Sequence, residues 1–368
     1  MTELHTYRLT PRAPLVFRSG KPFLAGTRDN TQFPWPSAWA GLLRTRYMDQ
    51  HGLGPDDRER LVALRTAGAL LAYRRGSHCE LYVPKPADAL ALKDEESFLP
   101  LRPLSAAAGT GCDLPAGLRP VGLVGSKKGK PHIPALYWTL SRFLAWARGE
   151  SVKASDESPR QPVEEMRTHV SIKNHTGAAD PGRLFQTTGL DFAMQDWQKG
   201  TASGEWVFVG QGPANLPPGL VVFGGERRLS RLDREDPTVW HLPPQLQIAL
   251  TKARGIAVTL ATPAIFANGW CPAWIGATLE GRWPGTALTL RLQAAAIDRW
   301  QPISGWDLQA GRAKPMRRAV AAGATYWLEI IDGELDPAAL WLHSMSDAQQ
   351  DRLDGFGLAL LRPWNPDI

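Results

Sequence analysis

The stretch that most constrains the fold is residues 166–192, because an alternating pattern followed by its own turn predicts two paired strands. One face of its first half carries Thr168, Val170 and Ile172. The opposite face is polar and basic and carries Arg167, His169, Ser171 and Lys173. Turn-forming residues fill 174–182, and a return strand begins at Leu184. A two-stranded arm is marginally stable alone in water, so this one indicates a surface that another molecule covers. An ordinary surface hairpin with solvated charges fits the spacing equally well.

The length of 368 residues allows two domains with separate cores. Hydrophobic residues make up 43% and charged residues 21%, as in ordinary globular proteins. The 42 basic residues exceed the 36 acidic ones too little to establish a polyanionic partner, so the clustering of cations matters more. Three cysteines, at 79, 112 and 271, lack the spacing of a disulfide framework or a zinc ribbon. No stretch approaches the ~20 apolar residues of a membrane span, and we expect a cytoplasmic protein.

The chain begins with a predicted strand at 5–11, a glycine-bearing basic loop at 14–33 and a helix at 36–52. Polar side chains along this path include Arg18, Lys21, Ser37 and Arg44. A strand, a loop and a helix in this order can seat a phosphate at the helix N-terminus. A solvated loop is the alternative interpretation.

The same patterns predict the remaining elements. Further helices are expected around 58–69, 136–148, 245–253 and 347–353. Strands are expected as a pair near 71–83 and at 206–209, 220–223, 256–261, 286–292, 326–331 and 358–361. The segment 150–162, rich in Ser, Pro and charge, is typical of a linker.

Two basic stretches mark the second half. In GGERR, Gly225 frees the backbone beside Arg227 and Arg228, so a phosphate could meet N–H groups and guanidinium groups together. Equally, Glu226 could neutralise one of the arginines. The second stretch is a phosphate-binding tract before the strand at 326–331, and it carries Arg312, Lys314, Arg317 and Arg318.

Aromatic and glycine residues add two weaker signals. Trp270, Trp274 and Trp283 could stack on bases, although tryptophans in such positions are more often half-buried packing residues. Gly355 and Gly357 flank Phe356, an arrangement that lets the backbone come against a partner.

Five motifs occur in an order that resembles the RAMP superfamily of CRISPR effector proteins, and within it the third subunit of the type III-B (Cmr) complex. They are PLVFRSGKPF with FPWPSAWAGLLRTRY, RTHVSIKNHTGAADPGRLFQTTGLDF, FGGERR, GWDL with KPMRRAVAAGATYWLE, and GFGLALLRPW. The resemblance implies an α+β fold of two ferredoxin-like (RRM-like) domains in tandem with a projecting β-hairpin arm. We expect an N-terminal RAMP domain with insertions at 1–162, the arm at 163–194, and a C-terminal RAMP domain at 195–368 that ends in a glycine-rich loop.

The resemblance also implies a function. It is that of a non-catalytic RNA-binding subunit of an antiviral ribonucleoprotein, holding the 5′ handle of the guide RNA. The implied partners are that RNA, the large polymerase-like subunit and the backbone RAMP subunits, with no membrane, cofactor or metal. The implied RNA contacts are Arg18, Lys21, Ser37, Arg44, Arg167, His169, Lys173, Gly225, Arg227, Arg228, Lys314, Arg317, Arg318, Gly355, Phe356 and Gly357.

Three other functions were weighed. A metal-independent endoribonuclease that matures guide RNA would use His169 or His175 as base and Lys173 to hold the scissile phosphate. No third group evidently orients either imidazole, so we expect no enzyme. A metal-dependent hydrolase is rejected, since the chain lacks H-E-x-x-H and its acidic pairs are typical of solvated surfaces. A purely protein-binding scaffold predicts that charge reversals in the basic tract leave RNA affinity unchanged.

Overall fold

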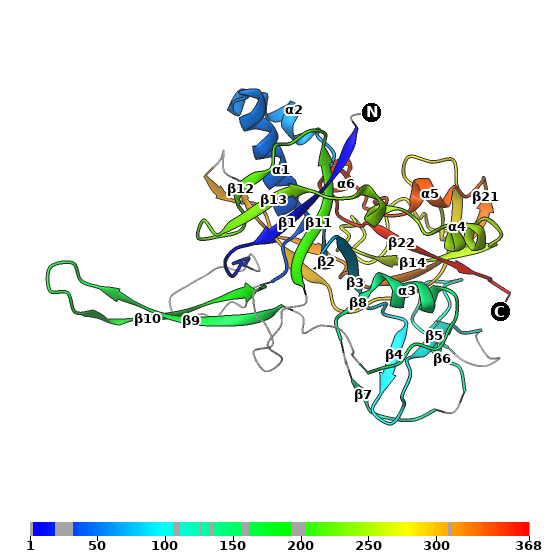
Figure 1. Cartoon of the computed structure of the whole chain (residues 1–368). Coiled ribbons are helices and arrows are strands. Elements are labelled where there is room, and N and C mark those ends of the chain that lie inside the picture. Colours follow the sequence, from blue (N-terminus) through cyan, green and yellow to red (C-terminus); the bar gives the residue numbers. More distant parts are fainter. Residues whose placement is uncertain are drawn as a thin grey trace.

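The computed structural model describes residues 3–18, 32–105, 111–125, 127–132, 135–155, 162–192, 204–307 and 311–367. Lys21 lies outside these ranges. The fold is mixed α+β, with many strands and few, mostly short helices. Figure 1 shows a body of sheets and helices from which one long hairpin projects.

The first sheet has seven antiparallel strands. In spatial order they are β12 (Gly219–Val222), β13 (Leu229–Arg234), β1 (Leu4–Pro11), β11 (Glu205–Pro213), β2 (Ala67–Arg75), β3 (His78–Pro84) and β8 (Tyr137–Thr139). Strands β11, β12 and β13 follow the arm in the sequence and yet belong to this sheet. The predicted boundary at residue 195 is therefore wrong, because it divides the first sheet, and the second sheet begins only at β14 (Gly255–Leu260).

The second sheet has five antiparallel strands, in the order β15 (Glu280–Arg282), β16 (Thr289–Ala296), β21 (Thr325–Asp332), β14 and β22 (Ala359–Trp364). A smaller four-stranded sheet contains β6 (Val121–Leu123), β5 (Leu99–Pro103), β4 (Ala89–Leu92) and β7 (Pro131–His132). A buried ion pair joins the two, since Arg362 on β22 lies 2.7 Å from Asp88 just before β4. Removing either partner of such a pair would leave an uncompensated buried charge.

The longest helix is α1 (Pro36–His51), which stops at Gly52 as predicted. The others are α2 (Arg58–Val62), α3 (Leu140–Ala147), α4 (Pro244–Thr251), α5 (Pro337–Leu340), α6 (Gln349–Asp354) and the 3-10 turns η1 (Pro55–Asp57) and η2 (Pro237–Trp240). Two predicted helices are shorter than expected. The one expected at 58–69 gives way to β2, and the one expected at 136–148 starts only after the edge strand β8.

Strands β2 and β11 are buried on both faces, which explains their continuous apolar sequence. Leu70 and Val207 pack in one cluster with Ile256 and Tyr326 of the second sheet. The opposite face of these strands joins a second cluster that includes side chains of α1, namely Leu71, Trp206, Phe208, Trp39 and Leu43. The two sheets therefore share one core, where length alone predicted two separate ones.

The arm is present as predicted. It consists of β9 (Val163–Ile172) and β10 (Ala179–Asp191), paired antiparallel, and it extends away from the body in Figure 1. Its base is fixed, because Leu15 and Leu190 exchange backbone hydrogen bonds of 2.9 and 2.7 Å and Phe192 is buried. The tip of the arm is exposed.

The glycine-rich loop, residues 355–357, lies inside the molecule. Gly355 ends α6 with φ of 90°, and a Cβ at this position would lie 3.1 Å from the Cα of Ala67 at the start of β2. Phe356 is completely buried among Ile265, Ile303 and Ala319. The expectation that this loop opens toward another molecule is thus corrected, since the partner that its backbone approaches is the first sheet of the same chain.

We predict that Gly355→Ala destabilises the protein by at least about 2 kcal/mol, because the new Cβ meets backbone atoms and the residue has a left-handed conformation. Thermal unfolding measures the effect. The control is Gly41→Ala within α1, where a Cβ meets nothing within 4 Å, so that this substitution should be neutral or stabilising. Equal unfolding temperatures for the two variants would contradict the close approach at Gly355.

Burial, followed by the charges of Arg65 and Arg352, lowers the pKa of His343 from 6.5 to about 4. Between these values the unfolded chain binds a proton that the folded chain does not, so the free energy of unfolding falls as the pH drops from 6.5 to 4. The loss is up to about 3 kcal/mol. We predict a flatter pH dependence of unfolding in His343→Gln, whereas His175→Gln, at the exposed turn of the arm, should behave like the wild type.

Candidate nucleic-acid interface

The arm presents a polar face built by the register of its strands. His169 lies opposite Phe185, and Arg167 lies opposite Thr187. The rings of His169 and Phe185 stack with centroids 5.1 Å apart, and the imidazole Nε2 is 2.8 Å from the Thr187 hydroxyl. The sequence thus places an aromatic pair and hydroxyl groups beside the arginine, a combination suited to contacts with nucleic acid bases and phosphates.

The cations of this face are exposed and paired with neighbouring carboxylates. Arg167 donates hydrogen bonds of 2.7 and 3.1 Å to Glu165, and the Nζ of Lys173 lies 3.7 Å from Asp180. Exposed pairs of this kind contribute little to stability, typically about 0–1 kcal/mol. A phosphate can therefore replace the carboxylate at small cost.

The opposite face of the arm is apolar and equally exposed. Met166, Val170, Ile172 and Leu184 have between 45% and 68% of their surface open to solvent. Val170 and Ile172 are residues that the alternating pattern assigned to one side of the first strand, and Leu184 is the partner of Val170 on the return strand. The arm therefore offers two chemically different faces.

Three segments that are distant in sequence meet at the base of the arm. Leu15 pairs with β10, and Gly225 donates a 2.8 Å hydrogen bond to the carbonyl of Val16. The hydrogen bonds to Glu165, and to a smaller extent the charge of Glu226, raise the pKa of Arg167. The structure thus brings the arm, the loop that contains exposed Arg18, and the GGERR turn to one place.

The GGERR turn resolves the two interpretations of its sequence. Glu226 and Arg227 have positive φ values of 56° and 52°, and Arg227 is exposed. Arg228 lies 2.6 Å from Glu226, so this glutamate neutralises one arginine, and the N–H group of Gly225 is already used by Val16. Arg227 is the cation of this turn that faces solvent.

Two other predicted contacts, Arg44 and Ser37, are not exposed side chains. Arg44 on α1 donates hydrogen bonds to Asp354 (2.6 Å) and to the carbonyl of Leu64 (2.8 Å), and only 11% of its side chain is exposed. Ser37 is half-buried in the first turn of α1. Neither side chain presents a free charge at the surface.

The cations of the basic tract also fall into two groups, one bound by a carboxylate and the other facing solvent. Arg317 donates two hydrogen bonds, 2.9 and 2.8 Å long, to Asp351, a carboxylate with 2% exposure. Lys314 and Arg318 are exposed, and the guanidinium carbon of Arg318 lies 4.9 Å from the centre of the Trp300 ring. Lys314 and Arg318 therefore face solvent, whereas Arg317 anchors the tract.

The glycine-rich loop has no backbone donor left for a ligand. The N–H groups of Gly355, Phe356 and Gly357 donate to the carbonyls of Arg352, Asp351 and Pro263. The expected role of these residues as RNA contacts is not supported by this arrangement, because all three are buried.

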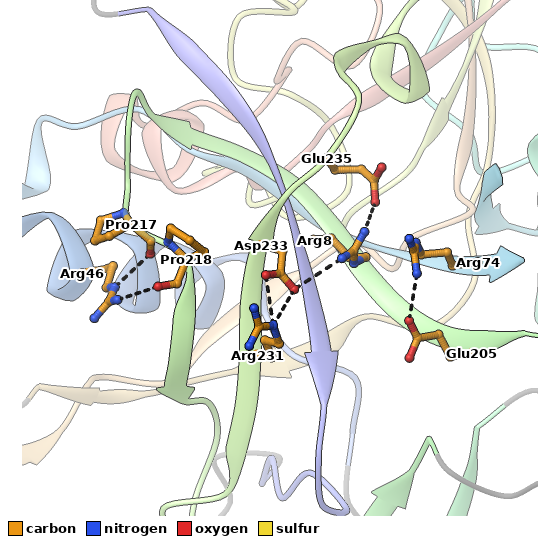
Figure 2. Close-up of polar contacts among 9 residues, drawn as sticks. All are labelled: Arg8, Arg46, Arg74, Glu205, Pro217, Pro218, Arg231, Asp233 and Glu235. Atoms are coloured by element: carbon orange, nitrogen blue, oxygen red, sulfur yellow. Dashed lines mark hydrogen bonds and ion pairs between the residues drawn. The ribbon is translucent and has the colours of Figure 1, made fainter. Parts of the chain in front are cut away.

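Several further arginines on the strands of the first sheet and on α1 are engaged by neighbouring groups (Figure 2). Arg8 is held by Asp233 and Glu235, and Arg46 donates to the carbonyls of Pro217 and Pro218. Arg74 and Arg231 have carboxylate partners as well. These contacts separate arginines that hold the fold together from those that remain available.

The sequence patterns missed two exposed aromatic residues, Trp300 and Trp306, which are 53% and 60% exposed. Both tryptophans lie shortly before the cations of the basic tract in the sequence, and this position was a signal that could have identified them. The three tryptophans that were considered behave largely as packing residues, with Trp283 fully buried, Trp274 bonded to the carbonyl of Met345, and Trp270 37% exposed.

Among the described residues, no group of three or more His, Cys, Asp or Glu side chains could hold a metal ion. Over the same ranges, no helix has the length and apolar character needed to cross a membrane.

The family model described as CRISPR-associated protein (Cas_Cmr3) matches residues 7–364. A chain in a structure of the Type III-B Cmr-beta bound to cognate target RNA is 14% identical, with a TM-score of 0.49, and the match covers 88% of this chain and 86% of that one. A chain of the Csm3-Csm4 subcomplex in the type III-A CRISPR-Cas interference complex is 10% identical, with a TM-score of 0.43 and coverage of 98% and 100%. No curated protein sequence matches. Since the family model extends from β1 to β22, the chain belongs to the Cas_Cmr3 family of CRISPR-associated proteins.

Proposed function

We propose that this protein is the third subunit of a type III-B CRISPR ribonucleoprotein, a non-catalytic component that binds the 5′ handle of the guide RNA. In this role it bridges the large polymerase-like subunit to the backbone RAMP subunits. Family membership supports the general assignment. The observation that carries the RNA-binding role is the projecting arm, whose polar face ends at a base shared with two other basic segments.

We also propose that both halves of the chain have a ferredoxin-like fold. Its support is that the two large sheets are antiparallel and that helices pack against them, as α1 does on β2 and β11. The seven-stranded sheet contains strands from both sides of the arm, so the arm is an excursion from the first half.

The contacts that we propose for the RNA are the exposed cations of this region, Arg18, Arg167, Lys173 and Arg227. Phosphates would exchange with the carboxylates that now pair with Arg167 and Lys173. The stacked His169 and Phe185 would lie against a base or ribose. Positioning by phosphate contacts suits a subunit that fixes the register of the guide.

A metal-independent endoribonuclease remains the alternative candidate. The observation in its favour is that Arg167 and His169 lie on one face of β9 and that Lys173 follows directly after this strand. A general base needs a group that orients its imidazole, and the partner of His169 is the hydroxyl of Thr187. We therefore place His169 among the binding residues.

We predict that the double variant Arg167→Gln/Lys173→Gln binds single-stranded RNA carrying a repeat-derived 5′ handle at least about tenfold more weakly at low salt. The slope of log affinity against log salt should become shallower by about 1.4 units, because two phosphate contacts to a single strand are lost. Binding is measured at several salt concentrations. The matched control is Arg148→Gln/Arg254→Gln, which removes two other exposed arginines that pair with carboxylates. Equal salt slopes for both variants would refute the arm as the phosphate-binding surface.

We also predict that the same RNA stays intact during incubation with the wild-type protein, with or without chelator, as judged on a denaturing gel. Specific cleavage that is lost in His169→Ala or His175→Ala would establish the endoribonuclease instead. Cleavage that survives in both variants would point to a contaminating nuclease.

A further inference from the structure

The C-terminal half contains a second antiparallel ribbon of strands, and we call residues 300–319 the basic ribbon. It contains two short ladders in succession, β17 (Gln301–Ile303) with β20 (Arg317–Ala319) and β18 (Trp306–Asp307) with β19 (Arg312–Ala313). Its described part comprises 300–307 and 311–319.

The base of the ribbon is firmly held. Ile303 and Ala319 are 2% and 1% exposed and pack against Phe356. Arg317 at the base binds the buried carboxylate of Asp351, and Asp307 in the outer ladder pairs with Arg58 of α2 at 3.3 Å. A ribbon anchored in this way can present its outer side chains in a defined arrangement.

The outer side chains are large aromatic groups and cations. Trp300 and Trp306 leave 53% and 60% of their surface in solvent, which is unusual for residues that carry so much apolar area. Arg318 already lies over one face of Trp300, at 4.9 Å from the ring centre. The Cα atoms of the two tryptophans are at most about 20 Å apart along the strand.

The charge of the ribbon is not neutralised from within. Within the described residues, no ion pair involves the side chains of Arg312, Lys314 or Arg318, and all three are exposed. The carboxylate of Asp307 is engaged by Arg58. Exposed cations on one segment beside exposed aromatic rings on the other complement a polyanion that also has flat apolar faces, and single-stranded nucleic acid has both.

We propose that the basic ribbon is a stacking platform for unpaired bases of single-stranded RNA, with Trp300 and Trp306 on the bases and Arg312, Lys314 and Arg318 on the phosphates. This inference rests on the proposed RNA-binding function. It adds a site that binds unpaired bases irrespective of their sequence. Every base has a face that can stack on indole, so the site tolerates any sequence.

The test compares RNA with bases and RNA without them. Trp300→Ala and Trp306→Ala should each weaken binding of handle RNA about tenfold while leaving its salt dependence unchanged, because no charge is removed. With RNA that carries abasic nucleotides at the stacked positions, the same substitutions should have no further effect. Trp300→Phe, which keeps an aromatic face, should retain most of the affinity.

Trp270→Ala is the control, since it removes a 37% exposed tryptophan of the second half that lies outside the ribbon. Wild-type affinity in both ribbon variants would overturn the stacking platform, and if these variants also failed to assemble with partner subunits, the ribbon would be a protein-docking surface. An equal loss of affinity on fully abasic RNA would overturn it too. A wild-type chain that binds no handle RNA, alone or with its partner subunits, would refute the proposed function itself.

Discussion

The structure depends on two carboxylates that α6 places side by side. Asp351 and Asp354 are three residues apart and therefore lie on neighbouring positions of the same helical face. Asp351 holds Arg317 of the basic ribbon, and Asp354 holds Arg44 of α1 on the first sheet. Both carboxylates are largely buried. Removing the arginine partner of either one would leave an unpaired buried charge, which destabilises a protein far more than the loss of a surface ion pair. Although α6 is short, its two carboxylates bind both the basic ribbon and α1.

The loop after α6 extends this junction. Gly355 permits the contact with Ala67, and Phe356 fills the space beneath the ribbon. The backbone of Thr66 donates a 2.8 Å hydrogen bond to Leu353, so the connection between the sheets is polar as well as apolar. The motif that resembles the glycine-rich loop of RAMP proteins therefore acts here as an internal joint. Its glycines are required because backbone meets backbone, which is the same physical reason that made a close approach predictable from the sequence.

Local sequence patterns predicted most individual helices and strands. They could not predict which strands that are distant in the sequence pair with one another. The alternation in β9, the proline and glycine that bound α1, and the apolar runs of β11 and β14 all act over a few residues, so they could be recognised directly. Which sheet a strand joins is not encoded in its own periodicity. For that reason the return of β11 to the first sheet, after the long arm, was missed. The same limit applies to arginines, because the partners of Arg44 and Arg317 lie 310 and 34 residues away.

The net charge of +6 says little about where an anion would bind, because the carboxylates are distributed unevenly around the cations. On the face shown in Figure 2, a phosphate would have to displace Asp233 or Glu235 from Arg8, a pair that is largely shielded from water. On the arm the side chains of the competing carboxylates, Glu165 and Asp180, are 33% and 24% exposed. On the ribbon no described carboxylate pairs with Arg312, Lys314 or Arg318, whereas Arg317 is held by Asp351. The free energy needed to separate a cation from its carboxylate thus decreases from the first sheet to the arm, and it is lowest for the exposed cations of the ribbon. All three surfaces contain arginines. The arrangement of carboxylates, as much as the arginines themselves, therefore favours the arm and the basic ribbon over the first sheet as places for an anionic ligand.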